Sequence, residues 1–206
     1  MQLNQLSFDL LHPQPLIIVI SGTSGIGKDA VICTMKARET GLHFVVTATS
    51  RPPRTNERDG IDYFFYSKEE FERRIQAGEF IEHALVYEQY KGIPRWQIDE
   101  AIKSGKDVIL KLDVQGAATI RKLYPEAVLI FLIPNTVEEW YDRLCDRKSE
   151  TEETLRVRVE TAIHEVGQID MFDYVVLNAR DRLQAAVDEI LAIVDVEHHR
   201  VHHRKM

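Results

Sequence analysis

The chain has 206 residues, of which 44% are hydrophobic and 29% are charged, and this composition excludes a largely disordered protein. Its formal net charge is −7, from 26 Lys and Arg against 33 Asp and Glu, so we expect no broad electrostatic binding of nucleic acid. The length suffices for one core domain with a smaller inserted lobe. Because the chain as a whole is acidic, any phosphate ligand must be bound by a local basic cluster.

The N-terminal residues 1–15 contain neither the basic start nor the long apolar run of a signal peptide. No apolar run in the sequence approaches the roughly 20 residues that cross a bilayer, so no membrane partner is expected. Residues 1–15 are interpreted as a flexible segment of a cytoplasmic protein. Cys33 and Cys145 lack the spacing of a disulfide framework or a metal site, which favours a reducing compartment, and are expected to be buried.

The first strand is expected at 16–21, where the apolar run LIIVIS meets a glycine-rich turn, as in a parallel strand covered on both faces. A helix should follow from Lys28 to about Arg38. Further apolar runs, separated mostly by helical patterns, lie at 43–48, 108–112, 127–133 and 174–177. This alternation predicts an α/β fold in which a five-stranded parallel sheet has helices on both faces.

The turn after the first strand fits GxxxxGK, the pattern of a phosphate-binding loop (P-loop), in the strand-to-helix context that this motif requires. Its glycines let successive N–H groups point inward, and the following helix adds positive potential at its N-terminus. Lys28 supplies a charge that can follow a γ-phosphate during transfer. The predicted ATP-binding residues here are Gly22, Thr23, Ser24, Gly25, Ile26, Gly27, Lys28, Asp29 and Ala30.

Asp29 and Ala30 stand where the motif usually has a hydroxyl residue that binds Mg²⁺. A carboxylate near a polyphosphate adds negative charge, so a cation should lie between the two. Asp29 is therefore a candidate ligand of the Mg²⁺ carried with ATP, either directly or through water. The alternative is a helix cap that points away from the metal.

The stretch 50–95 interrupts the alternation with a polar loop, a short aromatic strand, a helix and a second strand, and is expected to form an inserted lobe. Within it, two prolines separate Arg51 from Arg54 and hold the backbone near polyproline II. Both guanidinium groups then leave the same edge, an arrangement that suits a phosphate monoester.

Short signals mark several helix ends. Capping boxes, in which a hydroxyl and a carboxylate satisfy free backbone N–H groups, pair Ser67 with Glu70, Thr136 with Glu139 and Ser149 with Glu152. Gly78 and Gly105 stand where helices are expected to end.

Further blocks follow one another as TATSRPPRTNERDGIDYFF, GEFIEHALVYEQYKGIPR, LKLDVQGA, RLCDRKSETEETLRVRV and FDYVVLN. With the P-loop they resemble the guanylate kinase family of P-loop nucleoside monophosphate kinases over about residues 16–195. The resemblance implies a P-loop NTPase-type core (16–49 and 96–195), a small mixed α/β GMP-binding lobe (50–95) and a helical lid (about 143–160). Residues 196–206, beyond the resemblance, are expected to form a solvated polar tail. The resemblance also implies Mg²⁺-dependent phosphate transfer from ATP to GMP, with dGMP as a further candidate acceptor, by a monomer or a homodimer.

Position by position, the resemblance assigns the acceptor site. The residues implied for the GMP phosphate are Arg51, Arg54 and Tyr63, and those implied for guanine are Thr47, Glu82 and Asp113. A carboxylate such as Glu82 accepts the N1–H and 2-amino donors of guanine together, so losing both should disfavour AMP by at least about a hundredfold. Asp113, which follows a predicted strand, also fits a general-base or Mg²⁺-linked role.

Three positions near this site depart from the family pattern. Lys91 stands where the family often has a phosphate-facing tyrosine, and its ammonium can still donate to the GMP phosphate. Ile93 stands where a base-facing hydroxyl is usual, so base selection would depend more on Thr47 and Glu82. Lys111 stands where an acidic residue often precedes the aspartate by two positions, which bears on how the metal is held.

An arginine-rich segment near the predicted lid completes the implied machinery. The resemblance implies that Arg147 and Arg158 neutralise the phosphoryl group during transfer and that Asn178 contacts adenine. The catalytic residues implied are Lys28, Arg51, Arg147 and Arg158.

Two alternative functions are kept. A ribose bisphosphate phosphokinase can carry Asp after the P-loop lysine, but its acceptor would leave the guanine-facing residues without a purpose. A guanylate-kinase-like module of scaffold proteins, which binds phosphopeptides without catalysis, fits the missing P-loop hydroxyl. Lys28 and the lid arginines argue against that module.

Overall fold

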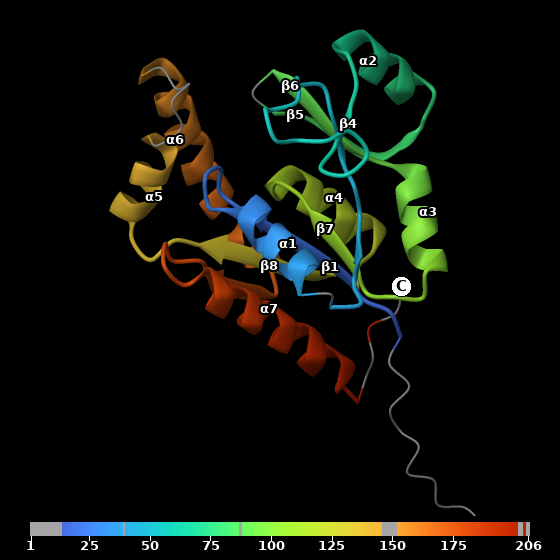
Figure 1. The fold of residues 1–206 in the computed structure, drawn as a ribbon, viewed down its shortest axis with the longest axis vertical. Coiled ribbons are helices and arrows are strands. Elements are labelled where there is room, and N and C mark those ends of the chain that lie inside the picture. Colours follow the sequence, from blue (N-terminus) through green and yellow to red (C-terminus); the bar gives the residue numbers. More distant parts are fainter. Residues whose placement is uncertain (1–13, 39, 87, 146–151, 202–203, 205–206) are drawn as a thin grey trace, which may run out of the picture.

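The computed structural model describes residues 14–38, 40–86, 88–145, 152–201 and 204. Its larger sheet has five parallel strands in the order β2 (His43–Phe44), β7 (Val108–Lys111), β1 (Ile17–Gly22), β8 (Val128–Ile133) and β9 (Tyr174–Leu177). The predicted five-stranded parallel sheet is therefore confirmed (Figure 1). Among the helices of the described part, none is long and apolar enough to span a membrane.

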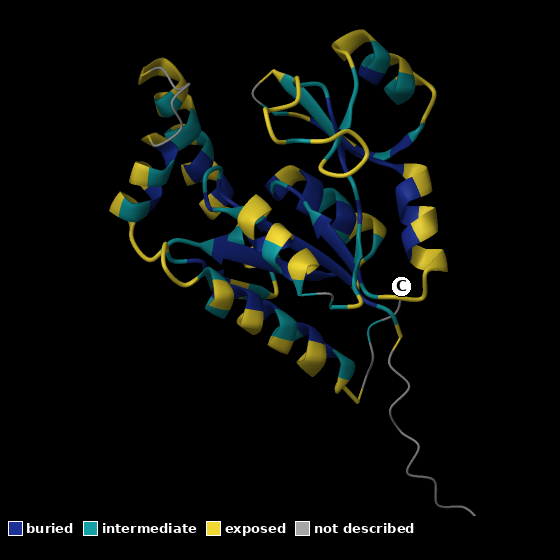
Figure 2. Ribbon diagram, in the orientation of Figure 1, coloured by how far each residue is buried: buried dark blue, intermediate teal, exposed yellow. Residues whose placement is uncertain are grey.

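Helices cover both faces of this sheet, as predicted. They are α1 (Lys28–Ala37) and α7 (Leu183–His198) on one face, and α3 (Arg95–Lys103) and α4 (Val114–Leu123) on the other. Along β1, Ile18 and Ile20 pack under α1 and α7, whereas Ile17 and Val19 pack under α3 and α4. Because successive side chains alternate between two buried faces, the strand is apolar throughout. The central strands β1, β7 and β8 are accordingly the most buried part of the ribbon (Figure 2).

A second, four-stranded mixed sheet stands beside the carboxyl ends of the first. Its order is β4 (Phe64–Phe65), β3 (Ala48–Thr49), β6 (Gln89–Pro94) and β5 (Phe80–Val86), and α2 (Lys68–Gln76) packs against it. Phe71 of α2 stacks on Phe80 and on Tyr90, with ring centroids 4.4 and 5.3 Å apart. These aromatic contacts form the small core that holds α2 on the sheet.

The single strand predicted at 43–48 is wrong, because two strands in different sheets share that stretch. His43 and Phe44 pair with β7, whereas Ala48 pairs with β4 and β6. Between them the N–H of Val46 donates to Oε1 of Gln97 at 2.8 Å, so a side chain takes the place of a strand partner. The apolar pattern is continuous because the chain stays at least partly buried as it crosses from one sheet to the other.

The helices α5 (Val137–Cys145) and α6 (Glu152–Val166) form a hairpin beside the P-loop, followed by the short 3₁₀ helix η2 (Ile169–Met171). Trp140 and Leu144 of α5 pack against Ala162 of α6. The indole Nε1 of Trp140 donates to the carbonyl of Ser24 at 2.9 Å, which ties this hairpin to the loop. The hairpin is therefore anchored to the P-loop by a hydrogen bond from a side chain to the backbone.

Of the two predicted capping boxes within the described residues, the hydroxyl half is confirmed, whereas the carboxylates of Glu70 and Glu139 bind Arg73 and Arg143 instead. Ser67 accepts a hydrogen bond from the N–H of Glu70, and Thr136 accepts one from the N–H of Glu139, each at 3.1 Å. Gly78, with φ of 68°, follows α2 in the left-handed conformation that stops a helix. The third capping box begins at Ser149, which lies outside the described residues.

Cys33 and Cys145 are exposed, so the prediction that both are buried is wrong. Each stands on the solvent side of an amphipathic helix. In α1 the buried positions are Val31, Ile32 and Met35, and Cys33 faces away from them. The hydrophobic character of cysteine did not by itself indicate on which face of its helix each residue lies.

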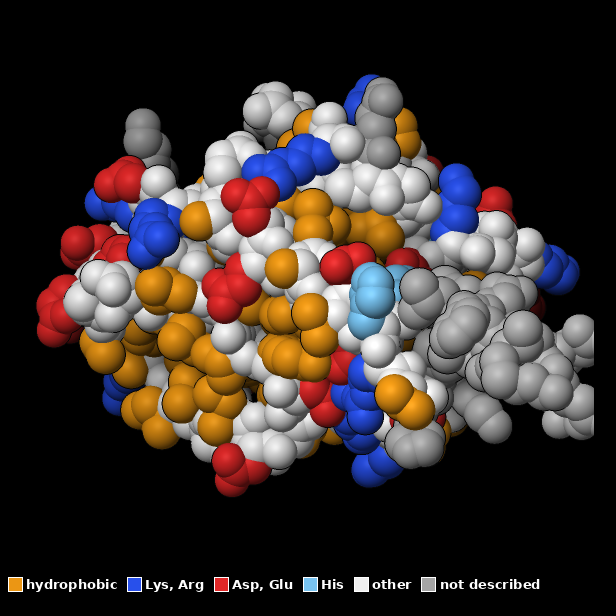
Figure 3. Space-filling view, turned by 90° about the horizontal axis from the view of Figure 1, so that it is seen from below, with side chains coloured by type: hydrophobic (Ala, Val, Ile, Leu, Met, Phe, Trp, Pro, Cys, Tyr) orange, Lys and Arg blue, Asp and Glu red, His pale blue; other side chains and the backbone are white. Residues whose placement is uncertain are grey.

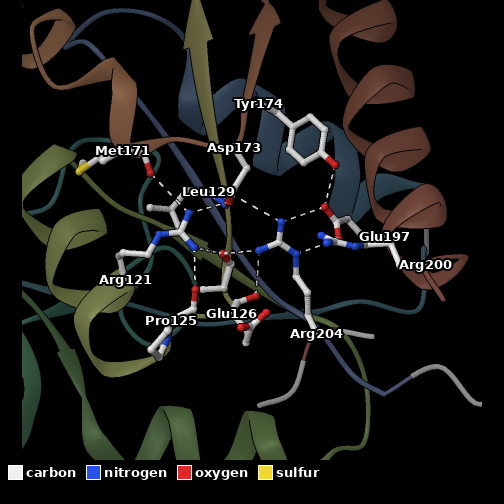
Figure 4. A network of polar contacts seen from close by, with 11 residues as sticks. Arg121, Pro125, Glu126, Leu129, Met171, Asp173, Tyr174, Glu197, Arg200 and Arg204 are labelled. Atoms are coloured by element: carbon white, nitrogen blue, oxygen red, sulfur yellow. Dashed lines mark hydrogen bonds and ion pairs between the residues drawn. The ribbon is translucent and has the colours of Figure 1, made fainter. Parts of the chain in front are cut away.

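Within the stretch predicted as a solvated tail, Glu197, Arg200 and Arg204 are bound to one another, and Glu197 is buried. Glu197 is 1% exposed and accepts hydrogen bonds from Tyr174 Oη at 2.6 Å, Arg204 Nε at 2.8 Å and Arg200 Nη1 at 3.1 Å (Figure 4). Burial by itself raises the pKa of Glu197, but these hydrogen bonds outweigh it and lower the pKa to about 2. Basic and acidic side chains lie next to one another on the face seen in Figure 3.

Arg204→Ala is expected to lower the free energy of unfolding by about 1–3 kcal/mol at pH 7, because it leaves the buried Glu197 carboxylate without its nearest charged donor. Urea denaturation measures the change. Because the pKa of Glu197 is depressed, its contribution is present above the unfolded value near 4.5 and is lost as pH falls toward 2, so the difference between the two proteins should shrink over that window. Arg200→Ala, which removes a more exposed partner, is the control, and equal losses from both variants would contradict the assignment.

Candidate active site

One cleft lies between the P-loop, the carboxyl ends of β1 and β7, the four-stranded sheet and α6. The residues that line it include Ser24, Gly25, Ile26, Gly27, Lys28, Asp29, Thr47, Arg51, Arg54, Tyr63, Glu82, Lys91, Lys111, Asp113, Arg158 and Glu165. The P-loop and the proposed acceptor residues therefore open onto the same space. Ligands bind at this edge of parallel sheets because the loops that follow the strands meet there.

The P-loop curls around the side chain of its own lysine. Lys28 Nζ donates to the carbonyls of Gly22 at 2.6 Å and Thr23 at 3.1 Å. Burial lowers the pKa of Lys28 to about 8, although the nearby Glu165 acts in the opposite direction. Gly27, with φ of 97°, precedes α1, and a Cβ there would lie 2.8 Å from Nδ2 of Asn178. An anion that binds in the loop would therefore find a preformed turn. It would also stabilise the charged form of Lys28, which burial disfavours.

Asn178 and Arg143 lie behind the loop. Nδ2 of Asn178 donates to the carbonyl of Ile26 at 2.7 Å, and Nη1 of Arg143 donates to the same carbonyl at 3.0 Å. Asn178 is buried, so in this state its amide positions the P-loop backbone. The residues Arg147 and Lys148 of the predicted lid lie outside the described residues.

The side of the cleft that was predicted to bind the acceptor contains a guanidinium fork that is already paired. Nη1 and Nη2 of Arg51 bind the two carboxylate oxygens of Glu57 at 2.6 and 2.5 Å, and the guanidinium stacks over Tyr63, 5.0 Å from the ring centroid. The backbone N–H of Arg54 donates to the same Glu57 at 2.8 Å. Glu57 therefore presents to Arg51 the bidentate pattern that a phosphate would present.

At the far end of the cleft, Glu82 lies on β5 and is 6% exposed. Burial, and after it the nearby Asp113, raise the pKa of Glu82 to about 8. Asp113 caps α4 by accepting a hydrogen bond from the N–H of Gly116 at 3.0 Å, while its other carboxylate oxygen lies 3.9 Å from Lys91 Nζ. The buried Thr47 lies on the same cleft wall, at the junction of the two sheets.

Asp29, the candidate metal ligand, is already paired. Its Oδ1 accepts a hydrogen bond from Lys111 Nζ at 2.6 Å. This ammonium also lies 4.2 Å from the centroid of the Tyr63 ring. The sequence showed only that Lys111 departs from the family pattern; the pairing depends on the adjacency of β7 and β1.

The sequence-based list of site residues omitted Glu165, which α6 presents to the cleft. Glu165 is 8% exposed, and its Oε2 has no hydrogen-bond partner among the described residues. Burial raises its pKa, and the Lys28 ammonium opposes that shift. Arg158, on the same helix, donates from Nη1 to Ser24 Oγ at 2.7 Å. Arg158 and Glu165 are seven residues apart, and this two-turn spacing was the signal that could have revealed Glu165.

A family model described as guanylate kinase matches residues 14–197, nearly the whole described chain. The chain belongs to the guanylate kinase family. Among its relatives, guanylate kinase 2, chloroplastic/mitochondrial, from Oryza sativa subsp. japonica is 50% identical over 193 residues, which are 93% of this chain and 68% of that protein. The guanylate kinase of Halalkalibacterium halodurans is 43% identical over 183 residues, 89% of each chain.

A solved structure supports the same family. The crystal structure of guanylate kinase from Anaplasma phagocytophilum matches with a TM-score of 0.72 and 26% identity, covering 93% of this chain and 90% of that one. As a guanylate kinase family member, the chain carries the phosphotransferase framework in which the P-loop and the lobe built on β3 to β6 face one cleft.

Proposed function

We propose that this protein is a guanylate kinase that transfers the terminal phosphate of ATP to GMP, giving ADP and GDP in the recycling of GMP. The observation that carries the proposal is the shared cleft, in which a P-loop lysine faces two arginines and a buried carboxylate. The lysine and the arginines suit phosphate groups, and the buried carboxylate suits guanine. The curated names of the relatives support the same activity.

In this proposal the donor and acceptor phosphates are bound from opposite sides. Lys28 and the P-loop N–H groups bind the β- and γ-phosphates of ATP, while Arg51, Arg54 and Tyr63 bind the GMP phosphate. The transferred phosphoryl group passes through a loose transition state that needs positioning and charge neutralisation more than covalent chemistry. Arg158 supplies such a charge beside the P-loop, and we propose the same role for Arg147. Asn178 would reach adenine only if it releases the Ile26 carbonyl.

Base selection is proposed to depend on Glu82. As a carboxylate it accepts both the N1–H and the 2-amino hydrogens of guanine, with Thr47 beside it. AMP offers neither donor and would leave the carboxylate buried without a partner, so it should be a poor acceptor. Lys91 and Asp113 complete the acceptor side in this proposal.

Asp29 is suited to be one of the ligands of the Mg²⁺ carried with ATP. No cluster of three or more His, Cys, Asp or Glu side chains in the described part could hold a metal alone. Asp29 is a largely exposed carboxylate in the first turn of α1, and Lys111 engages only its Oδ1 at 2.6 Å. A single carboxylate with phosphate oxygens and water is a usual Mg²⁺ environment. When bound, Mg²⁺ would neutralise charge on the β- and γ-phosphates.

An ADP-release assay with ATP, Mg²⁺ and a panel of acceptors tests the function. Rapid turnover with GMP and little with AMP is the expected result, and dGMP in the same panel tests the further acceptor. Turnover only with a ribose bisphosphate would select the sugar phosphate kinase. Absence of turnover with tight phosphopeptide binding would select the scaffold module.

Arg158→Ala is expected to lower kcat for GMP by about a hundredfold or more, with a much smaller change in KM, because the lost charge acts on the group being transferred. Arg156→Ala is a matched control on the same helix. Its side chain is 75% exposed and lies 3.7 Å from Glu160, outside the cleft. Equal effects of the two substitutions on kcat would contradict the role of Arg158.

We also propose a cytoplasmic location and action as a monomer or homodimer, as expected from the sequence. Exposed, unpaired Cys33 and Cys145 are compatible with a reducing compartment. Sedimentation measurements at micromolar concentration distinguish the two assemblies.

A further inference from the structure

A mostly buried cation, Lys111, lies between the two sides of the cleft. It ends β7 and pairs in register with Ile20 of β1, so it stands beside the start of the P-loop. Its Nζ lies 2.6 Å from Oδ1 of Asp29 and 4.2 Å from the centroid of the Tyr63 ring. Asp29 belongs to the first turn of α1, which follows the P-loop, and Tyr63 belongs to the proposed acceptor side. The ammonium therefore contacts one residue from each.

The two members of this ion pair differ in burial. The Lys111 side chain is 16% exposed, whereas the Asp29 side chain is 59% exposed. A cation buried to that extent needs an anion beside it, because loss of water is not otherwise compensated. An exposed carboxylate can turn back to water at little cost. A phosphate can therefore replace Asp29 as the partner of Lys111 while Lys111 stays in place.

We propose that Lys111 binds the phosphate of the acceptor nucleotide and that Asp29 is its counterion while the cleft is empty. The inference rests on the proposed function, because it takes GMP as the acceptor. It adds a cation to the arginines and the tyrosine already assigned to this phosphate. The acceptor side is favoured over the donor side because Lys111 contacts Tyr63. On the donor side, Lys28 already occupies the P-loop, bound to the carbonyls of Gly22 and Thr23.

The rival explanation is a structural ion pair between α1 and β7. The two explanations predict different signs. If the pair only supports the fold, removing either member should weaken GMP binding or leave it unchanged. If Asp29 competes with phosphate for Lys111, removing Asp29 should strengthen GMP binding and removing Lys111 should weaken it.

Calorimetric titration with GMP, without ATP and Mg²⁺, separates these explanations. We expect Lys111→Met to weaken binding by about tenfold or more and Asp29→Asn to strengthen it by about tenfold, since a charge-assisted hydrogen bond is lost or freed. The double variant should bind as Lys111→Met does, because Asp29 acts only through Lys111. Lys111→Arg should retain most of the affinity. Guanosine, which has no phosphate, should bind all variants equally.

Several results would overturn the inference: weaker or unchanged GMP binding by Asp29→Asn, equal effects on guanosine, or an effect confined to a parallel titration with ATP. Asp29 is exposed, so its variant decides the question even if Lys111→Met does not fold. Turnover of GMP by the unmodified protein tests the proposed function separately. That activity can stand while the assignment of Lys111 fails.

Discussion

Lys28→Met is expected to lower kcat for phosphate transfer from ATP to GMP by about 10²–10³-fold, since it removes a preorganised charge from the position of the transferred group. The fold should survive the change. Burial lowers the pKa of Lys28 to about 8, which means that holding it charged at pH 7 costs folding free energy. The variant should therefore unfold at no lower temperature than the unmodified protein. Steady-state kinetics and thermal unfolding measure the two effects.

Lys36→Met provides the matched control for Lys28→Met. Lys36 stands two turns further along α1, is exposed, and lies over the Phe44 ring outside the cleft. Its replacement should leave kcat unchanged. A loss of activity in Lys28→Met accompanied by a large fall in unfolding temperature would instead indicate a structural role for Lys28.

Glu82→Gln is expected to reduce kcat/KM for GMP by about a hundredfold and to bring GMP and AMP much closer together as acceptors. Glutamine accepts one hydrogen bond from guanine in place of two and opposes the second donor with its own N–H group. Competition between the two nucleotides in one assay measures the change. Retained discrimination would show that base selection lies elsewhere.

The same carboxylate predicts a pH dependence of GMP binding. Glu82 must be ionised to accept both guanine donors, yet burial and then Asp113 raise its pKa to about 8 in the empty cleft. GMP affinity should therefore rise as pH increases toward 8, and binding at pH 7 should release a proton from Glu82. Calorimetry in two buffers of different ionisation enthalpy measures this release. Glu82→Gln provides the baseline, because the proton exchange of the GMP phosphate remains.

The folding stability of the unliganded protein should fall over the pH range in which GMP affinity rises. Because the folded protein holds the Glu82 proton up to pH 8, the unliganded protein loses stability as pH rises from the unfolded pKa near 4.5 through 8. Glu82→Gln should remove that loss and be relatively more stable at pH 8 than at pH 5. If neither pH profile differs from that of the unmodified protein, the raised pKa is contradicted.

Sequence patterns by themselves determined the parallel sheet, its covering helices, the P-loop and the pairing of Arg51 with Arg54 across two prolines, whereas the other predicted cleft residues came from the resemblance to the family. Apolar runs such as that of β1 identify a strand buried on both faces, because local backbone geometry sets which side chains share a face. The spacing of Lys28 after three glycines likewise depends on one continuous turn. Such signals extend over few residues, so they can be recognised without knowing what lies beside them.

Only the tertiary structure decided the features that depend on distant neighbours. The crossing of residues 43–48 between two sheets depends on Gln97, Lys111 meets Asp29 because β7 adjoins β1, and Glu165 faces Lys28 because α6 packs beside the P-loop. Tyr174 of β9 likewise meets Glu197 only once α7 covers the sheet. The physical reason is common to these cases. A buried polar or charged group needs a partner, and tertiary packing determines which group becomes that partner. Packing brings together segments that are far apart in the sequence, and no local sequence pattern indicates which segments these are.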